Sequence, residues 1–279
     1  MSIKRALGWV LTWFTLAMAF CAGIWAIQGR EHAIEFLGGY VVEYSLSVDN
    51  LFVFLMLFTS FGLTDRQQRR VLNYGIMGAV VLRLAFILLG SALVANFHWV
   101  LYVFGGILLL SAARMTMGMD APRNYHNSYS LRLMSSIIPC TNCFDHDHFI
   151  VRKGGCRYAT MLLMVLVLVE LSDIVFAVDS IPAVFSITTN TFIVFTSNLF
   201  AILGLRSLYF VLEKLHESFG LVKYGVAAIL AFTGAKLILP YFHIEIPVMH
   251  SIVAIVGILT LSVLASVVKE RRQLSRPAD

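Results

Sequence analysis

Long apolar stretches run along this sequence at short intervals, and they limit what the chain can fold into. They cover roughly residues 6–27, 36–61, 71–95, 99–117, 159–185, 190–212, 221–239 and 247–268. A helix needs about 20 apolar residues to cross a bilayer. The whole chain is 59% apolar and 13% charged, whereas soluble domains contain about 25% charged residues. The sequence therefore predicts an all-α polytopic membrane protein of about eight transmembrane helices, with residues 1–279 forming a single membrane domain in a lipid bilayer.

The connections between these stretches predict the orientation in the membrane, because Lys and Arg are retained on the cytoplasmic side. Successive connections lie on opposite sides of the membrane. On one side, Arg30 is the only basic residue in the connections. The other side holds the remaining basic residues of the connections and ends: Lys4, Arg5, Arg66, Arg69, Arg70, Arg123, Arg132, Arg152, Lys153, Arg157, Lys214, Lys223, Lys269, Arg271, Arg272 and Arg276. We expect a protein of the cell (inner) membrane with both termini in the cytoplasm. The net charge of +5 is explained by this topology and does not indicate nucleic-acid binding.

Charged residues also lie inside the predicted spans. The acids are Glu43, Asp49, Glu170, Asp173 and Asp179, and the bases are Arg83, Arg114, Arg206 and Lys236. A charge at the bilayer centre costs at least about 2.5–3.5 kcal/mol on insertion scales, so each needs a partner or a water-filled cavity. Such residues predict a functional site or pathway.

The order of these charges indicates an internal repeat. The segment Glu43-Tyr-Ser-Leu-Ser-Val-Asp49-Asn50 has the layout of Asp173-Ile-Val-Phe-Ala-Val-Asp179-Ser180. Arg83 then corresponds to Arg206, and Arg114 to Lys236, in similar surroundings and in the same order. Each repeat holds three spans, in residues 36–117 and 159–239, so the second enters the membrane from the opposite face. Transporters with such inverted repeats bind substrate near midplane at the repeat interface.

Helical geometry separates the acids within each segment. Residues six apart differ by about 120° around a helix, so Glu43 and Asp49 cannot share one narrow face. In the second segment a helix break is expected at Pro182, which has no amide hydrogen to donate to the carbonyl of Val178. An opened carbonyl there would be a cation ligand.

Two interpretations of the charges remain open. In the first, Arg83 and Arg206 pair permanently with Asp49 and Asp179 or their neighbours and lock helices together. In the second, the acids bind a cation, because they outnumber the bases by one and stand beside Asn50 and Ser180. The predicted metal ligands are Glu43, Asp49, Asn50, Glu170, Asp173, Asp179 and Ser180, with Arg83, Arg114, Arg206 and Lys236 in charge pairing or coupling.

The ligand chemistry narrows the cation to a class. Carboxylate, amide and hydroxyl oxygens suit Mg²⁺, Ca²⁺ or Mn²⁺ better than Zn²⁺ or Cu⁺. Release of a proton from a buried carboxyl group on binding would couple transport to protons. No resident cofactor is expected, since the metal would be the transported substrate.

Three segments resemble the TerC family of integral membrane proteins. They are Glu43–Asn50, the run from Glu170 to Ala183, and the run from Phe195 to Tyr209. The similarity is greatest to the pH-responsive Alx-like branch and covers nearly the whole chain. Members of the family are regarded as manganese exporters of the LysE-like transporter group. The resemblance implies Mn²⁺ export, a role in ion homeostasis, and a site at Glu43, Asp49, Asp173 and Asp179.

The predicted cytoplasmic loop, residues 118–158, departs from what the family would lead one to expect. It contains Cys140, Cys143, His146 and His148, with Cys156 shortly after. A Cys-x-x-Cys followed by His residues predicts either a transition-metal site or a thiol switch. The alternative is a polar loop whose thiols stay reduced in the cytosol.

Other classes of function are less well supported by the residues. Asp173 and Asp179 lack the Gly-x-Gly-Asp motif of intramembrane aspartyl proteases, so we do not expect an enzyme. The competing hypothesis is a membrane-protein assembly or stress-response factor without transport activity. The oligomeric state and the coupling ion cannot be inferred from the sequence.

Overall fold

The fold is an all-α bundle, seen in a computed structural model that describes residues 3–117, 148–153, 156–215 and 222–274. The helices are α1 (Ile3–Gln28), α2 (Arg30–Ser60), α3 (Asp65–Asn96), α4 (Val100–Thr116), α6 (Met161–Phe185), α7 (Thr191–Leu215), α8 (Val222–Ile238), the short 3₁₀ helix η3 (Leu239–Phe242) and α9 (Val248–Leu274). Each long helix coincides with one apolar stretch, which confirms the predicted fold class.

Seven of the helices in the described ranges are long and apolar enough to cross a membrane. The eighth, α4, has 17 residues and is shorter. Helix α2 begins six residues before the apolar stretch that predicted it, because its first turn is polar. The polar first turn of α3 was missed in the same way, because apolar content locates the membrane-buried part of a helix and not its ends.

Local sequence explains several helix ends. Gly29, between α1 and α2, has a φ of 95°, a conformation that glycine adopts without strain. Thr64 and Gln67 form a capping box at the start of α3, in which the Gln67 Oε1 accepts from the Thr64 backbone N–H at 3.0 Å. Asn190 caps α7, since its Oδ1 accepts from the backbone N–H of Phe192 at 3.1 Å.

The expected break at Pro182 is wrong. Helix α6 runs without interruption from Met161 to Phe185, with Pro182 inside it. Pro182 lies in the last turn, so the missing amide hydrogen leaves few helical bonds beyond it to disturb. Residues 181–188 are all buried, and this packing holds the end of the helix in place.

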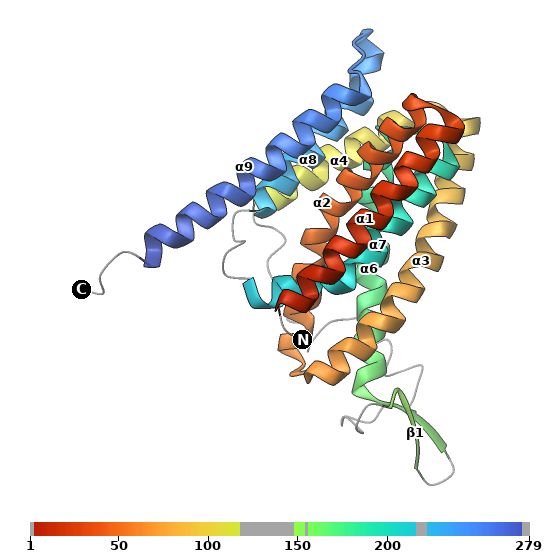
Figure 1. Ribbon diagram of the computed structural model, residues 1–279. Helices are drawn as coiled ribbons and strands as arrows, with labels where there is room; N and C mark the ends of the chain where they lie inside the picture. Colours follow the sequence, from red (N-terminus) through yellow and green to blue (C-terminus); the bar gives the residue numbers. More distant parts are fainter. Residues whose placement is uncertain (1–2, 118–147, 154–155, 216–221, 275–279) are drawn as a thin grey trace.

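The helices form two groups (Figure 1). Helices α1, α2, α3, α6 and α7 lie side by side, and α4, α8 and α9 extend from them at one edge. The contact between α2 and α7 is close at Gly39, where an added Cβ would come within 2.6 Å of the Ser197 Oγ. Helices α4 and α8 approach at Gly105, where a Cβ would lie 2.8 Å from the Gly234 carbonyl oxygen. Small residues thus permit close packing of helices, as is common in membranes.

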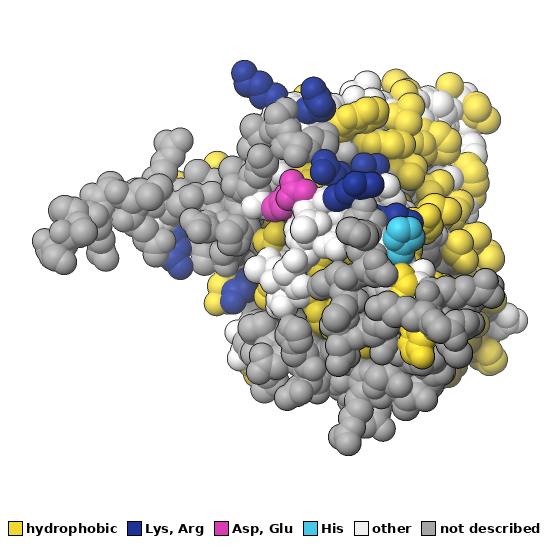
Figure 2. Space-filling view, turned by 90° about the horizontal axis from the view of Figure 1, so that it is seen from below, with side chains coloured by type: hydrophobic (Ala, Val, Ile, Leu, Met, Phe, Trp, Pro, Cys, Tyr) yellow, Lys and Arg dark blue, Asp and Glu magenta, His cyan; other side chains and the backbone are white. Residues whose placement is uncertain are grey.

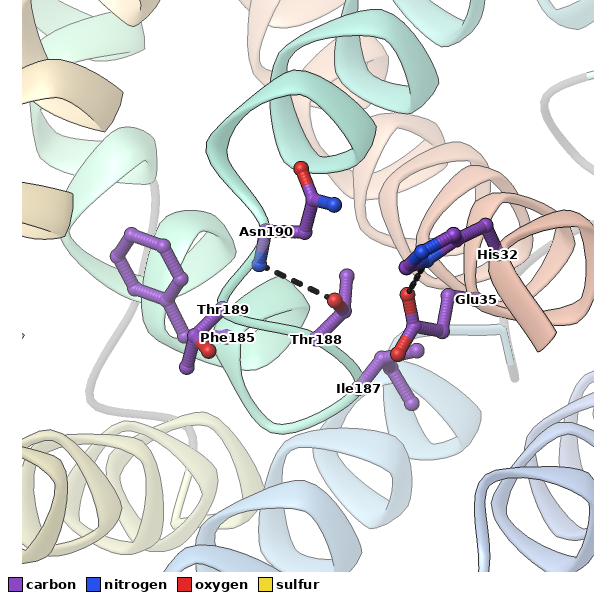
Figure 3. Close-up of a pocket in the computed structure, with 7 residues that line it drawn as sticks. All are labelled: His32, Glu35, Phe185, Ile187, Thr188, Thr189 and Asn190. Carbon is purple, nitrogen blue, oxygen red and sulfur yellow. Dashed lines mark hydrogen bonds and ion pairs between the residues drawn. The ribbon is translucent and has the colours of Figure 1, made fainter. Parts of the chain in front are cut away.

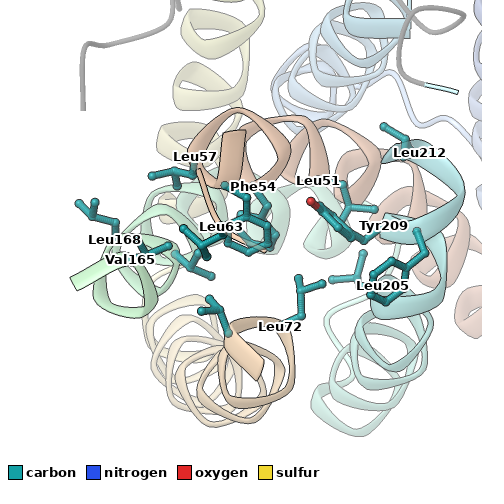
Figure 4. Packing of buried hydrophobic residues seen from close by; sticks show 14 of the residues in the cluster. Leu51, Phe54, Leu57, Leu63, Leu72, Val165, Leu168, Leu205, Tyr209 and Leu212 are labelled. Atoms are coloured by element: carbon teal, nitrogen blue, oxygen red, sulfur yellow. The ribbon is translucent and has the colours of Figure 1, made fainter. Parts of the chain in front are cut away.

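A large apolar cluster fills one end of the first group (Figure 4). It includes Leu51, Phe54, Leu72, Val165 and Leu205, contributed by α2, α3, α6 and α7. The α2–α3 connection and the beginning of α6 lie at this same end. We call this set the apolar plug.

A β-hairpin precedes α6 and was not predicted. Its strands are β1 (Ile150–Lys153) and β2 (Cys156–Ala159), paired antiparallel. Phe149 fixes its base: its carbonyl accepts from the Thr160 amide at 3.0 Å, and its ring contacts Tyr74 of α3. His148 is exposed, and its carbonyl oxygen accepts from the Thr160 hydroxyl. The other members of the predicted thiol site, Cys140, Cys143 and His146, lie outside the described residues.

Candidate functional site

A buried guanidinium group lies at the centre of the bundle and joins three helices. Arg83, near the middle of α3, is only 1% exposed, and Glu43 of α2 is fully buried. The Arg83 Nη1 donates to Glu43, and its Nη2 forms an ion pair with the Asp173 Oδ1 of α6 at 3.3 Å. Arg83 Nε also donates to the Asp173 Oδ2 at 3.4 Å. This geometry holds two carboxylates and one guanidinium, a formal charge of −1, away from solvent.

Neutral oxygen atoms complete the surroundings of Arg83. Its Nη1 lies 3.3 Å from the Ser180 Oγ and 3.2 Å from the Asn198 Oδ1 of α7. The Asn198 Nδ2 donates to the Glu43 Oε2 at 2.8 Å, and Ser47 donates to the other oxygen of Glu43 at 3.3 Å. We call Glu43, Arg83, Asp173, Ser180 and Asn198 the central cluster.

Asp179 lies apart from the central cluster, as its position on α6 predicts. Its Oδ1 accepts from the Ser111 hydroxyl of α4 at 2.7 Å. Asn50 is buried at 3% exposure, and its Nδ2 has no hydrogen-bond partner among the described residues. The side chain of Asp49 lies outside the described part of the chain.

The other predicted charges are placed differently. Arg206 and Arg114 have exposed side chains, although both sit on apolar helices. The Lys236 Nζ is buried without a described hydrogen-bond partner, and so is the Glu170 Oε2. Arg83 therefore pairs with the first acid of each repeated segment, Glu43 and Asp173. From the sequence, Arg83 and Arg206 were considered as partners of Asp49 and Asp179 or of their neighbours. The structure instead pairs Arg83 with the first acid of each segment, because these acids face α3.

One small cavity adjoins the central cluster, and a larger one lies at the end of the bundle where α2 and α7 begin. The smaller, with a volume of about 20 Å³, has room for one water molecule beside Asp173 and is otherwise lined by apolar residues and Gly75. The larger, about 500 Å³, opens at the opposite end of the bundle near His32, Glu35, Thr188 and Asn190 (Figure 3). His32 and Glu35 form an ion pair there, with 3.0 Å between Nδ1 and Oε2.

The central cluster presents several oxygen acceptors to a single buried cation, the Arg83 guanidinium. Within the described residues, no group of three or more His, Cys, Asp or Glu side chains is arranged to hold a metal ion. Instead, the Arg83 guanidinium occupies the space between the carboxylate, amide and hydroxyl oxygens that could serve as ligands. Sequence reasoning missed two polar partners, Asn198 and Ser111. The isolated amide of Asn198 inside an apolar span was the signal that could have identified it.

A comparison with known families identifies the family of the chain. Residues 28–274 match the integral membrane protein TerC family. The chain belongs to the TerC family. The match covers both repeated segments and the helices that carry the central cluster. The chain is therefore an integral, multi-pass membrane protein associated with the lipid bilayer.

Several TerC relatives are similar over most of their length. Two proteins named Alx and provisionally described as membrane-bound redox modulators, from Salmonella typhi and Escherichia coli (strain K12), are each 46% identical over 270 residues, covering 94% of this chain and 84% of the relative. An uncharacterized membrane protein of Myxococcus xanthus is 44% identical over 276 residues, covering 99% of this chain and 86% of the relative. No solved structure matches the chain.

Proposed function

We propose that this TerC protein is a membrane transporter that exports a divalent metal cation, Mn²⁺, through the central cluster. The observation that carries the proposal is the buried ion pair of Arg83 with Glu43 and Asp173 near the middle of three helices. Buried ionisable residues at membrane depth are costly and mark ion pathways. The cation is the substrate, and no enzymatic reaction is proposed.

The transport step would exchange Arg83 for the metal. Glu43 and Asp173 supply carboxylate oxygens, and Asn198 and Ser180 supply an amide and a hydroxyl oxygen, the ligand types that Mn²⁺ and Mg²⁺ prefer. The guanidinium must leave these oxygens before a metal can bind, because both cations need the same acceptors. Asp49, Asn50 and Asp179 are proposed as further ligands along the pathway.

The packing of the helices supports the inverted repeat. A twofold relation between residues 36–117 and 159–239 would exchange α2 with α6, α3 with α7, and α4 with α8. It would convert the α2–α7 contact into the α3–α6 contact, and both are extensive. Helices α4 and α8 would contact each other across the axis, as they do. On this basis the central cluster lies at the repeat interface.

Surface charge supports the proposed orientation. Figure 2, which views the molecule from below, shows Lys and Arg side chains gathered on the end where α3 begins. Arg66, Arg69 and Arg70 belong to the first turns of α3. This is the end that we assign to the cytoplasm of the inner membrane, together with both termini.

The test is metal transport by purified protein in liposomes. Mn²⁺ movement should be measured for the wild type, Glu43→Gln and Asp173→Asn, with Glu245→Gln in an exposed connection as the matched control. We expect both cluster variants to lose transport and the control to retain it. Cellular manganese content under manganese stress, with and without the protein, would test the direction. Absence of Mn²⁺ movement by the wild type, or full transport by both cluster variants, contradicts the proposal.

The name of the Alx relatives favours a redox-related role as the second candidate. The residues that could carry it are Cys140 and Cys143. A Cys140→Ser, Cys143→Ser variant that transports Mn²⁺ normally but loses a redox phenotype in cells would support that role. If the protein is instead an assembly or stress-response factor without transport activity, neither the manganese content nor the redox phenotype of cells should depend on Glu43 and Asp173.

A further inference from the structure

The large cavity at the end of the bundle where α2 and α7 begin is not part of the central cluster. It has a volume of about 500 Å³, and His32 and Glu35 of α2 help to line it. Figure 3 shows both side chains on the side of α2 that faces Thr188 and Asn190, in the connection between α6 and α7. The His32 and Glu35 side chains are 39% and 24% exposed, so water and dissolved ions reach both.

The distance between these two side chains suits a metal ion. The His32 Nδ1 lies 3.0 Å from the Glu35 Oε2. Two ligand atoms on neighbouring corners of an octahedral cation, each about 2.1 Å from the ion, are about 3.0 Å apart. A cation can therefore replace the hydrogen bond after small rotations of the two side chains. The proton of the neutral imidazole then resides on Nε2, which leaves the Nδ1 lone pair for the metal.

The spacing of the pair in sequence is also that of known metal ligands. In di-iron and di-manganese carboxylate proteins, a Glu and a His three residues apart on one helix both project toward the metal. His32 and Glu35 have this separation and lie within the uninterrupted helix α2. One rigid element therefore positions both side chains.

The pair lies along α2 from the central cluster. Glu35, Gly39 and Glu43 follow one another at intervals of four residues, which places them along one side of the helix, and Glu35 is about 12 Å from Glu43 along its axis. Contact between helices closes the space at Gly39, where an added Cβ would lie 2.6 Å from the Ser197 Oγ and 3.3 Å from the Val184 Cγ1. The cavity thus leads toward the central cluster and is separated from it by this contact.

We propose that His32 and Glu35 form an outer site for a divalent transition-metal cation, whose remaining ligands are water molecules. The cavity has room for them, because a water molecule occupies about 30 Å³ in the liquid. Thr188 and Asn190 line the cavity with hydroxyl and amide groups that can hydrogen-bond to such water. Only two protein ligands hold the ion, which makes binding weak and suits an ion in transit. The place of the site in transport rests on the proposed function, whereas its metal binding does not.

The imidazole gives the outer site a selectivity that the central cluster lacks. Glu43, Asp173, Ser180 and Asn198 offer oxygen atoms to a cation, and Mg²⁺ and Ca²⁺ prefer oxygen ligands. An imidazole nitrogen favours transition metals over these two ions, and Zn²⁺ binds such a mixed set of ligands more tightly than Mn²⁺ does. The outer site should therefore retain Mn²⁺ in an excess of Mg²⁺ and lose it to Zn²⁺.

The first test is electron spin-echo spectroscopy of Mn²⁺ added to purified full-length protein in detergent. An imidazole nitrogen bound to Mn²⁺ modulates the echo, whereas oxygen ligands do not. We expect this nitrogen modulation in the wild type, its persistence in about tenfold excess Mg²⁺, and its decrease in His32→Ala. His98→Ala is the matched control, because His98 is exposed in the connection between α3 and α4. Equal modulation in the wild type and His32→Ala, or its removal by Mg²⁺, overturns the inference.

A second variant examines the carboxylate. In Glu35→Gln the side chain still accepts a hydrogen bond but carries no charge, so the fold should be kept while the affinity for Mn²⁺ at this site falls by about tenfold or more. The Mn²⁺ concentration at which the nitrogen modulation is half-maximal measures the affinity. Glu31→Gln is the control, since Glu31 is exposed on the same helix and does not line the cavity. An unchanged affinity in Glu35→Gln would show that Glu35 is not a ligand.

The third test concerns transport. In liposomes, Mn²⁺ exchange by His32→Ala should need a higher Mn²⁺ concentration for half-saturation on the side of the cavity, and the wild-type concentration on the other side. An unchanged value on the side of the cavity contradicts the place of the site in the pathway. Wild-type protein that binds Mn²⁺ through His32 but moves none contradicts the proposed function alone and leaves the metal site established.

Discussion

The Asn198 amide of α7 donates to the Glu43 Oε2 of α2 at 2.8 Å, while its Oδ1 lies 3.2 Å from the Arg83 guanidinium. One neutral side chain thus satisfies both an acid and a base of the same buried ion pair. It also ties α7 to a site whose charges come from α2, α3 and α6. The amide can make both contacts because its two ends differ, one being a donor and the other an acceptor.

Asn198→Ala should therefore destabilise the protein. The change leaves a buried carboxylate oxygen without its donor, and hydrogen bonds to charged groups contribute about 1.5–3 kcal/mol. Thermal unfolding in detergent would measure the loss. Asn96→Ala is the matched control, because that amide is exposed and, among the described residues, donates to the Ala92 carbonyl of its own helix. Equal melting temperatures for the two variants would contradict the assigned role of Asn198.

The two arginines that correspond in the repeat should behave differently. Arg83→Gln removes the cation between two buried carboxylates, and breaking a buried pair costs about 3–5 kcal/mol. Arg206→Gln changes an exposed side chain and should cost less than about 0.5 kcal/mol. Denaturation of both variants in the same detergent checks this. Similar losses would mean that the two arginines contribute equally to stability, contrary to their different burial in the structure.

Ser111 should affect Asp179 without affecting the central cluster. Ser111→Ala removes the donor that joins α4 to α6 at 2.7 Å and should cost about 1 kcal/mol. In a double-mutant cycle with Asp179→Asn, the two effects should not be additive, because the residues share one bond. Additive losses of thermal stability would show that the bond contributes nothing.

Close packing of α2 on α7 predicts a strong effect at Gly39. Gly39→Ala would bring a methyl group against Ser197 and Val184 and should cost about 1–3 kcal/mol through overpacking. Gly23→Ala in α1 meets nothing within 4 Å and should be neutral. Thermal unfolding compares the two changes. A neutral Gly39→Ala would indicate that the helices can separate at this contact without cost.

The fold could be predicted from sequence because a bilayer imposes a strong length rule on apolar helices. Every long helix of the described chain matches a stretch that was identified by that rule. The ends could not be predicted as well, since they depend on caps such as Thr64 and Asn190. The continuity of α6 through Pro182 depends on neighbouring helices, which the sequence of α6 does not reveal.

The site could be predicted in part. Glu43, Asp173, Arg83 and Ser180 were identified as charged or polar residues inside apolar spans, and the structure brings them together. Their pairing was not predictable, because it depends on how α2 and α6 turn toward α3. The exposed side chain of Arg206 shows the same limit: a repeat in sequence does not specify which copy faces inward.

The apolar plug has a kinetic consequence. A hydrated ion cannot pass between Leu51, Leu72 and Leu205 while these side chains remain packed, and the nearly complete burial of Arg83 shows that the opposite end does not expose the site either. Each ion would require the helices to rearrange, at the microsecond-to-second pace of such collective motions. Electrical recordings from this protein in planar bilayers should therefore show no unitary conductance steps, and its turnover should rise steeply with temperature.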